Sequence, residues 1–175
     1  KSLFQSIKGI SFSEPFLKMP YNEAIEFYGS DKPDLRFGMR FREITKPVKG
    51  FGFQVFDSAE YVGAIVAGGA SEYTRKQLDE LTEFVKRPQI GAKGLVYVKC
   101  GTDGSLKSSV DKFYNPEELA KWAELTGAKP GDLILILAGD RNKTLTALSE
   151  LRLEMGNRLG LRNRDTYAPL WVVDF

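Results

Sequence analysis

The chain has 175 residues, of which 42% are hydrophobic and 12% aromatic, so it can bury one good core and should form one main globular domain. Its 25 lysines and arginines against 23 aspartates and glutamates give a net charge of +2, which excludes neither an RNA partner nor a small-molecule partner. A single cysteine, Cys100, and the absence of histidine exclude an internal disulfide, the usual zinc ligands and every Ser-His or Cys-His nucleophile pair, and they fit a reducing, cytoplasmic setting.

A short amphipathic helix is predicted over residues 21–28, because its apolar side chains fall at i, i+3, i+4 and i+7. Gly29 follows in the position of a helix C-cap. Residues 29–34 then consist of turn-forming types, and Pro33 keeps the residue before it out of the helical region. They predict an ordered loop.

Two β-rich runs come next, at residues 51–56 and 61–67, and the four residues between them suit a hairpin connection. The second run is nearly all apolar, so it should be buried. Thr74 with Gln77 then makes a capping box, which begins a predicted helix over residues 75–87.

A compact apolar strand is predicted at residues 95–98. A turn at residues 101–104 closes it, and residues 105–113 are the candidate for a further strand that returns beside it.

The clearest helix start in the sequence lies at Asn115, Pro116 and Glu118, which suit the N-cap, the first helical position and the capping-box partner. Trp122 lies on the face of this helix that is predicted to be buried. Gly127 ends the helix.

A continuous apolar run at residues 133–138 has the length of a strand, and a long helix is predicted over residues 142–159. This order of elements implies a sheet with helices packed on it, and the hairpin connections favour a mixed or antiparallel sheet. We therefore expect an α+β fold. No apolar run approaches the roughly 20 residues of a membrane span, so no membrane partner is expected.

Two glycine-containing turns before predicted helices resemble phosphate-binding loops, because backbone N–H groups at a helix start attract anions. Residues 68–71 lack both the P-loop spacing and the dinucleotide-binding spacing, which favours a plain turn. For residues 139–144, an Asp or Asn that caps the helix explains the pattern.

Four arginines, Arg152, Arg158, Arg162 and Arg164, cluster at the end of the last predicted helix and beyond it. Such a group either meets phosphates or complements the negative end of the helix dipole. Solvated or dipole-pairing arginines are the favoured interpretation. Arg158, Arg162 and Arg164 are kept as the candidate contact with the phosphates of a nucleic acid.

Acidic and aromatic residues have a structural interpretation that is favoured over a catalytic or base-stacking one. Acidic side chains on a helix usually form its solvated face, and the aromatic spacing already fits buried faces. The residues concerned are Glu72, Asp79, Glu80 and Glu83 for the acidic group, and Phe51, Phe53, Phe56 and Trp122 for the aromatic group.

Both ends of the chain resemble bacterial aspartyl-tRNA synthetases, which belong to class II. Residues 21–38, with the string Tyr-Gly-Ser-Asp-Lys-Pro-Asp-Leu-Arg-Phe-Gly, are similar to the stretch just before the large insertion of these enzymes. Residues 151–161 and 170–175 resemble the stretch where the enzymes re-enter the catalytic domain. The middle resembles their insertion (GAD) domain, at Gly68-Gly69, Arg75-Lys76-Gln77, Lys112-Phe113 and Gly131-Asp132-Leu133 among other positions.

The resemblance implies a fold and a domain arrangement. The family's insertion domain is a two-layer α/β sandwich with a sheet of about four strands. The implied limits are residues 1–46 for a catalytic-domain segment, 47–141 for the insertion domain and 142–175 for the return segment. We expect the middle segment to fold independently, and a chain that begins at a lysine and stops within an apolar, strand-like run looks like an internal fragment.

The function that the resemblance implies is aspartate–tRNA ligation, in which aspartate is activated with ATP and magnesium and then transferred to tRNA. The family's catalytic, cofactor-binding and metal residues lie in motifs outside this chain, so no such residue is assigned here and the chain alone is expected to be inactive. The parent is expected to be a cytoplasmic homodimer. The alternative is a non-catalytic tRNA-binding module of a glutamyl-tRNA amidotransferase, which shares only the middle segment.

Overall fold

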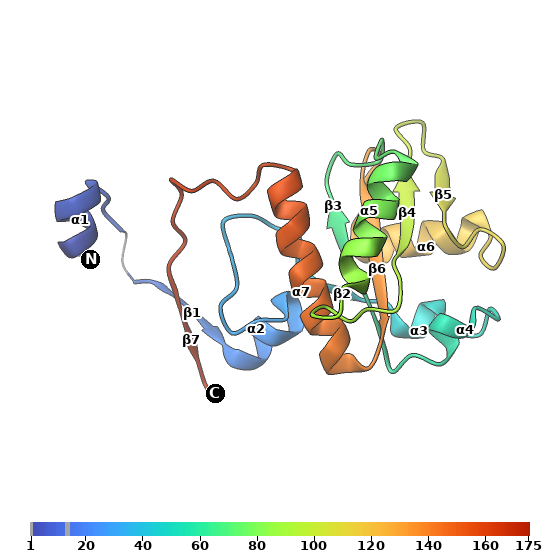
Figure 1. The fold of residues 1–175 in the computed structure, drawn as a ribbon, viewed down its shortest axis with the longest axis horizontal. Helices are drawn as coiled ribbons and strands as arrows, with labels where there is room; N and C mark the ends of the chain where they lie inside the picture. The colour runs from blue at the N-terminus through green and yellow to red at the C-terminus, as the bar shows by residue number, and fades with distance from the viewer. Residues whose placement is uncertain (1, 13–14) are drawn as a thin grey trace.

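The computed structural model describes residues 2–12 and 15–175. Within these residues, helices and strands are interspersed along the chain (Figure 1). The elements are α1 (Ser2–Lys8), β1 (Leu17–Pro20), α2 (Tyr21–Tyr28), β2 (Arg42–Glu43), α3 (Thr45–Val48), α4 (Gln54–Asp57), β3 (Tyr61–Ala67), α5 (Arg75–Lys86), β4 (Val96–Cys100), β5 (Leu106–Ser108), α6 (Pro116–Thr126), β6 (Leu133–Gly139), α7 (Arg141–Arg158) and β7 (Leu170–Val173).

The main sheet has five strands in the order β2-β3-β6-β4-β5, and every neighbouring pair is antiparallel. Strands β3 and β6 form its centre, with Tyr61 opposite Gly139 and Ala67 opposite Leu133. Both strands are almost entirely buried, which was predicted for β3 from its apolar run. The α+β class and the antiparallel sheet with helices packed on it are confirmed, with five strands where about four were expected.

Helices cover both faces of this sheet (Figure 1). Alternate residues of β3 and β6 point to opposite faces, so each strand contributes to two apolar clusters. Helices α5 and α7 bury the first cluster, which includes Ile65, Leu81 and Leu148. Helix α6 and the short helices α3 and α4 bury the second, which includes Phe56 and Trp122.

The predicted strand at residues 51–56 is wrong, and so is the hairpin that would have joined it to the next strand. Residues 51–53 form bends and α4 is a single helical turn. Gly50 and Gly52 take φ values of 92° and 82°, outside the range of a strand, and the carboxylate of Asp57 accepts hydrogen bonds from both of their N–H groups. The ladder position beside β3 is taken by β2 instead.

The predicted helix ends are largely confirmed. Thr74 and Gln77 make the capping box of α5, and Asn115 accepts a hydrogen bond from the backbone N–H of Glu118 at the start of α6. The Glu118 carboxylate pairs with Lys121 at 2.8 Å instead of reaching back to the N-cap. Gly29 ends α2 in the left-handed conformation, as expected. Within residues 105–113, only β5 forms as a strand.

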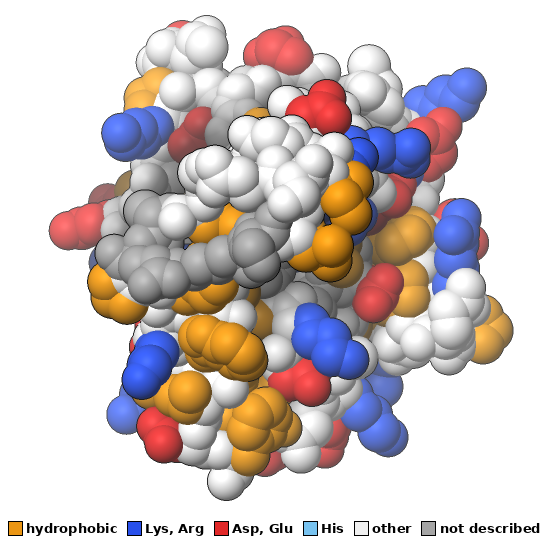
Figure 2. Space-filling view, turned by 90° about the vertical axis from the view of Figure 1, so that its left-hand side faces the viewer, with side chains coloured by type: hydrophobic (Ala, Val, Ile, Leu, Met, Phe, Trp, Pro, Cys, Tyr) orange, Lys and Arg blue, Asp and Glu red, His pale blue; other side chains and the backbone are white. Residues whose placement is uncertain are grey.

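A second, two-stranded sheet lies at the opposite end of the molecule from the main sheet, with α7 between them (Figure 1). It pairs β1 with β7 in parallel, Leu17 opposite Leu170 through Pro20 opposite Val173. Helix α2 packs on it, around Met19. Figure 2 shows apolar side chains gathered on the lower half of this end of the molecule, and Trp171 is 60% exposed there.

Helix α7 is an integral part of the main core. Leu145, Leu148, Leu151 and Met155 are buried in the first apolar cluster, against β3 and β6. A domain limit at residue 141 would separate these side chains from the sheet that they cover. Among the described residues, no helix has the length and apolar character required to cross a bilayer.

Candidate functional site

Arg152 departs most from its predicted role, because it is buried rather than solvated. It is 2% exposed and lies on the inward face of α7, four residues after Leu148 and three before Met155. This helical spacing in the sequence already placed Arg152 on the apolar face, and the interpretation as a solvated or dipole-pairing group overlooked it.

The guanidinium of Arg152 hydrogen-bonds to the backbone of residues 34–39, a segment that we call the 34–39 loop. Its Nη2 donates to the carbonyl oxygens of Asp34, Phe37 and Gly38 at 2.8, 2.9 and 2.7 Å. Its Nε lies 3.2 Å from the carbonyl oxygens of Gly38 and Met39. The planar guanidinium therefore donates hydrogen bonds to carbonyl groups along the whole 34–39 loop.

Two aromatic rings enclose the charge of Arg152. The guanidinium carbon lies 4.0 Å from the ring centroid of Phe37 and 4.9 Å from that of Tyr28. Burial lowers the pKa of Arg152 to about 10, mainly because the charged form loses its water. The side chain is still cationic at neutral pH, with carbonyl dipoles and ring faces in place of a carboxylate.

Asp34 forms the second feature of this junction. Its carboxylate accepts two hydrogen bonds from the side chain of Arg36, at 2.9 and 2.7 Å, one from the backbone N–H of Arg36 at 3.1 Å, and one from Nε of Arg162 at 3.2 Å. The hydrogen bonds from Arg36 hold the pKa of Asp34 well below its usual range, against the opposing effect of burial. A carboxylate so fully paired is a poor proton acceptor, so Asp34 has the chemistry of a structural anchor.

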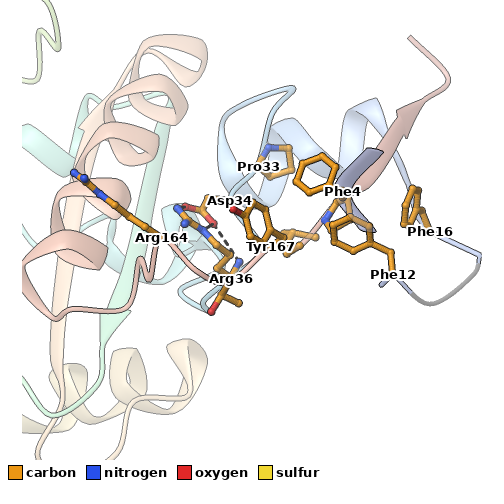
Figure 3. Close-up of a pocket in the computed structure, with 12 residues that line it drawn as sticks. Phe4, Phe12, Phe16, Pro33, Asp34, Arg36, Arg164 and Tyr167 are labelled. Carbon is orange, nitrogen blue, oxygen red and sulfur yellow. Dashed lines mark hydrogen bonds and ion pairs between the residues drawn. The ribbon is translucent and has the colours of Figure 1, made fainter. Parts of the chain in front are cut away.

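The predicted arginine cluster does not form one cationic patch. Arg158 donates to Glu154 at 2.8 Å and lies 3.6 Å from Glu80, and Arg162 is paired with Asp34. Arg164 is exposed and, among residues 2–12 and 15–175, has no ion-pair partner. Its guanidinium extends away from the neighbouring aromatic side chains (Figure 3).

A cavity of about 390 Å³ lies beside Asp34, between the N-terminal segment and residues 164–169 (Figure 3). Its apolar wall is a set of aromatic rings packed edge to face. The ring centroid of Phe4 lies 5.3 Å from that of Phe12 and 5.4 Å from that of Tyr167. Its polar rim includes Asp34 and Arg36, which bind each other, together with Thr166 and Arg164. The cavity therefore offers mainly apolar surface, and Arg164 is the lining arginine that has no ion-pair partner among the described residues.

The two glycine-containing turns are structural, as the favoured interpretation had it. The N–H of Gly69 donates to the carboxylate of Asp132 at 3.0 Å. At the start of α7, Asp140 caps the N–H of Lys143 at 3.0 Å, and the N–H of Arg141 donates to Glu60. Side chains of the protein thus already occupy these donors.

Two side chains that could act in catalysis, those of Cys100 and Tyr61, have raised pKa values. Cys100 is buried, and burial raises the pKa of its thiol, which makes it a weak nucleophile. Burial raises the pKa of Tyr61 to about 12. No group of three or more acidic, cysteine or histidine side chains is arranged to hold a metal ion among residues 2–12 and 15–175.

The acidic residues and most of the aromatic residues lie where the structural interpretation put them. All four acidic residues, at 72, 79, 80 and 83, are exposed at or on α5, and three of them pair with basic side chains. Phe56 and Trp122 are fully buried, whereas Phe51 is 38% exposed.

Comparison of the chain with known proteins shows which family and which relatives it is similar to. The model of the family described as "GAD domain" matches residues 54–148, which is more than half of the chain. An aspartate–tRNA ligase of Bacteroides fragilis is 62% identical over 176 residues, and those of Phocaeicola vulgatus and Flavobacterium psychrophilum are 61% and 54% identical over 176 and 175 residues. Each alignment covers 100% of this chain and 30% of the relative, so the chain spans about a third of the length of these curated relatives.

Proposed function

The chain belongs to the GAD domain family, and from this premise we propose that it is an internal part of an aspartate–tRNA ligase. In this proposal, the longer protein activates aspartate with ATP and transfers it to tRNA. The observation that carries the proposal is the extent of the similarity. The alignments with aspartate–tRNA ligases run through the whole chain, including the residues on both sides of the matched GAD region.

Those flanking residues also decide between the two candidate functions. A GAD domain by itself suits either a ligase or the tRNA-binding module of a glutamyl-tRNA amidotransferase. Residues before 54 and after 148 lie outside the family model, and they form the 34–39 loop, its Arg152 contacts and the pair β1–β7. Because these parts align with aspartate–tRNA ligases, they favour the ligase.

The small sheet β1–β7 supports the proposal that this chain continues into a larger catalytic domain. A two-stranded sheet is marginally stable on its own, and parallel strands are normally covered on both faces. Here α2 covers one side, while Leu17 and Trp171 are 54% and 60% exposed. We propose that further strands of the longer protein complete this sheet. The limits 1–46, 47–141 and 142–175 are kept as the proposed arrangement along the chain, with α7 packed on the insertion domain.

The cofactors and partners of the proposed enzyme follow from its reaction. They are ATP and magnesium as cofactors, aspartate and tRNA as substrates, a second copy of the same subunit as partner, and the cytoplasm as location. No residue of this chain is assigned to the binding of ATP, magnesium or aspartate. The pairing of Asp34 with Arg36 and Arg162 makes that carboxylate a poor candidate for a magnesium ligand or a general base.

The proposal is tested by aspartate-dependent exchange of labelled pyrophosphate into ATP. The full-length protein should catalyse the exchange, and the 175-residue chain should show no rate above a no-protein control. Attack on the α-phosphate develops negative charge, and the described residues hold no prepared set of free cations and metal ligands to offset it. Exchange by the full-length protein with a different amino acid only would disprove the assignment, and exchange by the short chain would place the active site within it.

RNA contact by Arg158, Arg162 and Arg164 remains a proposal, and the structure sharpens its test. Arg158 and Arg162 already bind carboxylates, so RNA phosphates would have to compete with Glu154 and Asp34, whereas Arg164 is available. We expect Arg164→Ala to weaken binding of the chain to a tRNA acceptor-stem hairpin and to reduce the slope of log affinity against log salt by about one unit.

The matched control for this measurement is Arg75→Ala, which removes an exposed arginine from the start of α5. It should leave the affinity and the salt slope unchanged. Equal losses in the two variants would indicate diffuse attraction of RNA to the chain, and no loss for Arg164→Ala would place the contact elsewhere.

A further inference from the structure

Helix α7 lies between the two parts of the molecule (Figure 1). On its outer side, α2 and the 34–39 loop each approach it too closely at one point for a side chain to intervene. A Cβ added at Gly29, the C-cap of α2, would overlap the carbonyl oxygen of Leu145. A Cβ added at Gly156 would lie 2.7 Å from the ring of Phe37. Gly156 stands within the helix, where glycine is unfavourable, so its place is explained by this contact. The 34–39 loop and α2 thus fit α7 in one position.

The side chain of Arg152 links the fit of the 34–39 loop on α7 to the backbone conformation of that loop. Its guanidinium is buried without a carboxylate, and the carbonyl groups of the 34–39 loop replace the water that it has lost. Any rearrangement of the loop would leave a buried cation without acceptors. Met39, at the end of the loop, has a φ of 63°, a left-handed conformation that is unfavourable for a non-glycine residue and therefore requires support from its surroundings.

A second set of contacts ties the loop to the chain beyond α7. Asp34 binds Arg162, and Nη1 of Arg36 donates to the carbonyl oxygen of Asn163 at 2.6 Å. These contacts connect residues that precede the GAD region with residues that follow it. They lie at the place where the chain enters and leaves that region, so the freedom of the region to turn depends on them.

We propose that Arg152 is a positioning residue that locks the GAD region in one orientation relative to the segments that carry β1 and β7. The lock consists of Arg152 in α7, the 34–39 loop that it holds, and the ring of Phe37 between Arg152 and Gly156. The inference goes beyond the proposed ligase function and stands independently of it, because it concerns the relative motion of two parts of this chain.

The test compares backbone N–H residual dipolar couplings of the 175-residue chain with those of Arg152→Met. In the unaltered chain, one alignment tensor should fit the amides of β3 and β6 together with those of α2, β1 and β7. In Arg152→Met, which keeps much of the side-chain length and loses every donor, two tensors should be required, and the one for α2, β1 and β7 should fall by about twofold or more in magnitude. Amide exchange in the 34–39 loop should become about tenfold faster or more, while exchange in β3 and β6 stays unchanged.

Arg158→Met is the matched control, because it makes the same change at an exposed arginine of the same helix. It should retain a single tensor. Arg152→Lys serves as the second variant if Arg152→Met does not fold. It keeps the charge and loses the planar fork, and it should also require two tensors. A single tensor in a folded Arg152 variant would overturn the proposal. Equal acceleration of exchange in the loop and in β3 and β6 would also overturn it, because Arg152 would then act on global stability rather than on orientation.

Discussion

A chain that ends at residue 141 should show no cooperative thermal unfolding, because α7 covers one face of the main sheet. Without it, Ile65, Leu135 and Leu137 lose the partners Leu148 and Leu151 and face water. Each buried leucine lost from a core costs about 2–5 kcal/mol, and a domain of this size is stable by only about 5–15 kcal/mol. The loss of several such side chains therefore exceeds the stability that is available.

The measurement compares residues 40–141 with residues 40–159 by calorimetry and circular dichroism. The longer piece keeps α7 and should unfold in one transition, whereas the shorter one should show a gradual, non-cooperative change. This reverses the expectation that residues 47–141 fold independently. A sharp transition in the piece that ends at 141 would show that α5 alone protects this face and that the insertion domain folds without α7.

Trp122→Ala should lower the free energy of unfolding by about 3–5 kcal/mol, the range found when a fully buried large side chain is truncated. Trp122 is 0% exposed and lies at the centre of the second apolar cluster, with its ring 4.5 Å from Tyr114 and 6.0 Å from Phe56. Truncation would leave a cavity that these rings, held by their own contacts, cannot fill. Denaturant unfolding of the 175-residue chain gives the difference directly.

Two controls separate packing from other roles of the tryptophan. Trp171→Ala removes the same side chain from an exposed site and should change stability by no more than about 0.5 kcal/mol. Trp122→Phe keeps most of the volume and removes the indole N–H, which has no hydrogen-bond partner in the structure. Its cost should be well below that of Trp122→Ala, because a buried unpaired donor itself costs about 1–3 kcal/mol. A small effect of Trp122→Ala would mean that the cluster closes over the gap.

The sequence by itself determined those local structures whose stabilising contacts lie within a few adjacent residues. The capping box of Thr74 and Gln77, the cap at Asn115 and the left-handed Gly29 each depend on bonds that span only a few residues, and all three formed as predicted. The apolar runs of β3 and β6 likewise predicted strands, and β3 was expected to be buried, since a nearly all-apolar strand is stable inside a sheet covered on both faces. The strings of the middle segment indicated the insertion (GAD) domain family, which the match of residues 54–148 confirms.

Tertiary structure decided the features whose partners lie far away along the chain. Residues 51–56 have the composition of a strand, but Gly50 and Gly52 turn the chain, and Phe56 packs against Trp122 of α6. Arg152 meets carbonyl groups 113 to 118 residues away, and only the closing of α7 onto the 34–39 loop shows that they replace a carboxylate. Periodicity assigns a residue to the inner or outer face of its own helix. It does not specify which groups a distant segment places against that face. At this junction, the carbonyl groups of the 34–39 loop decide that Arg152 is a buried, hydrogen-bonded cation and not a solvated one.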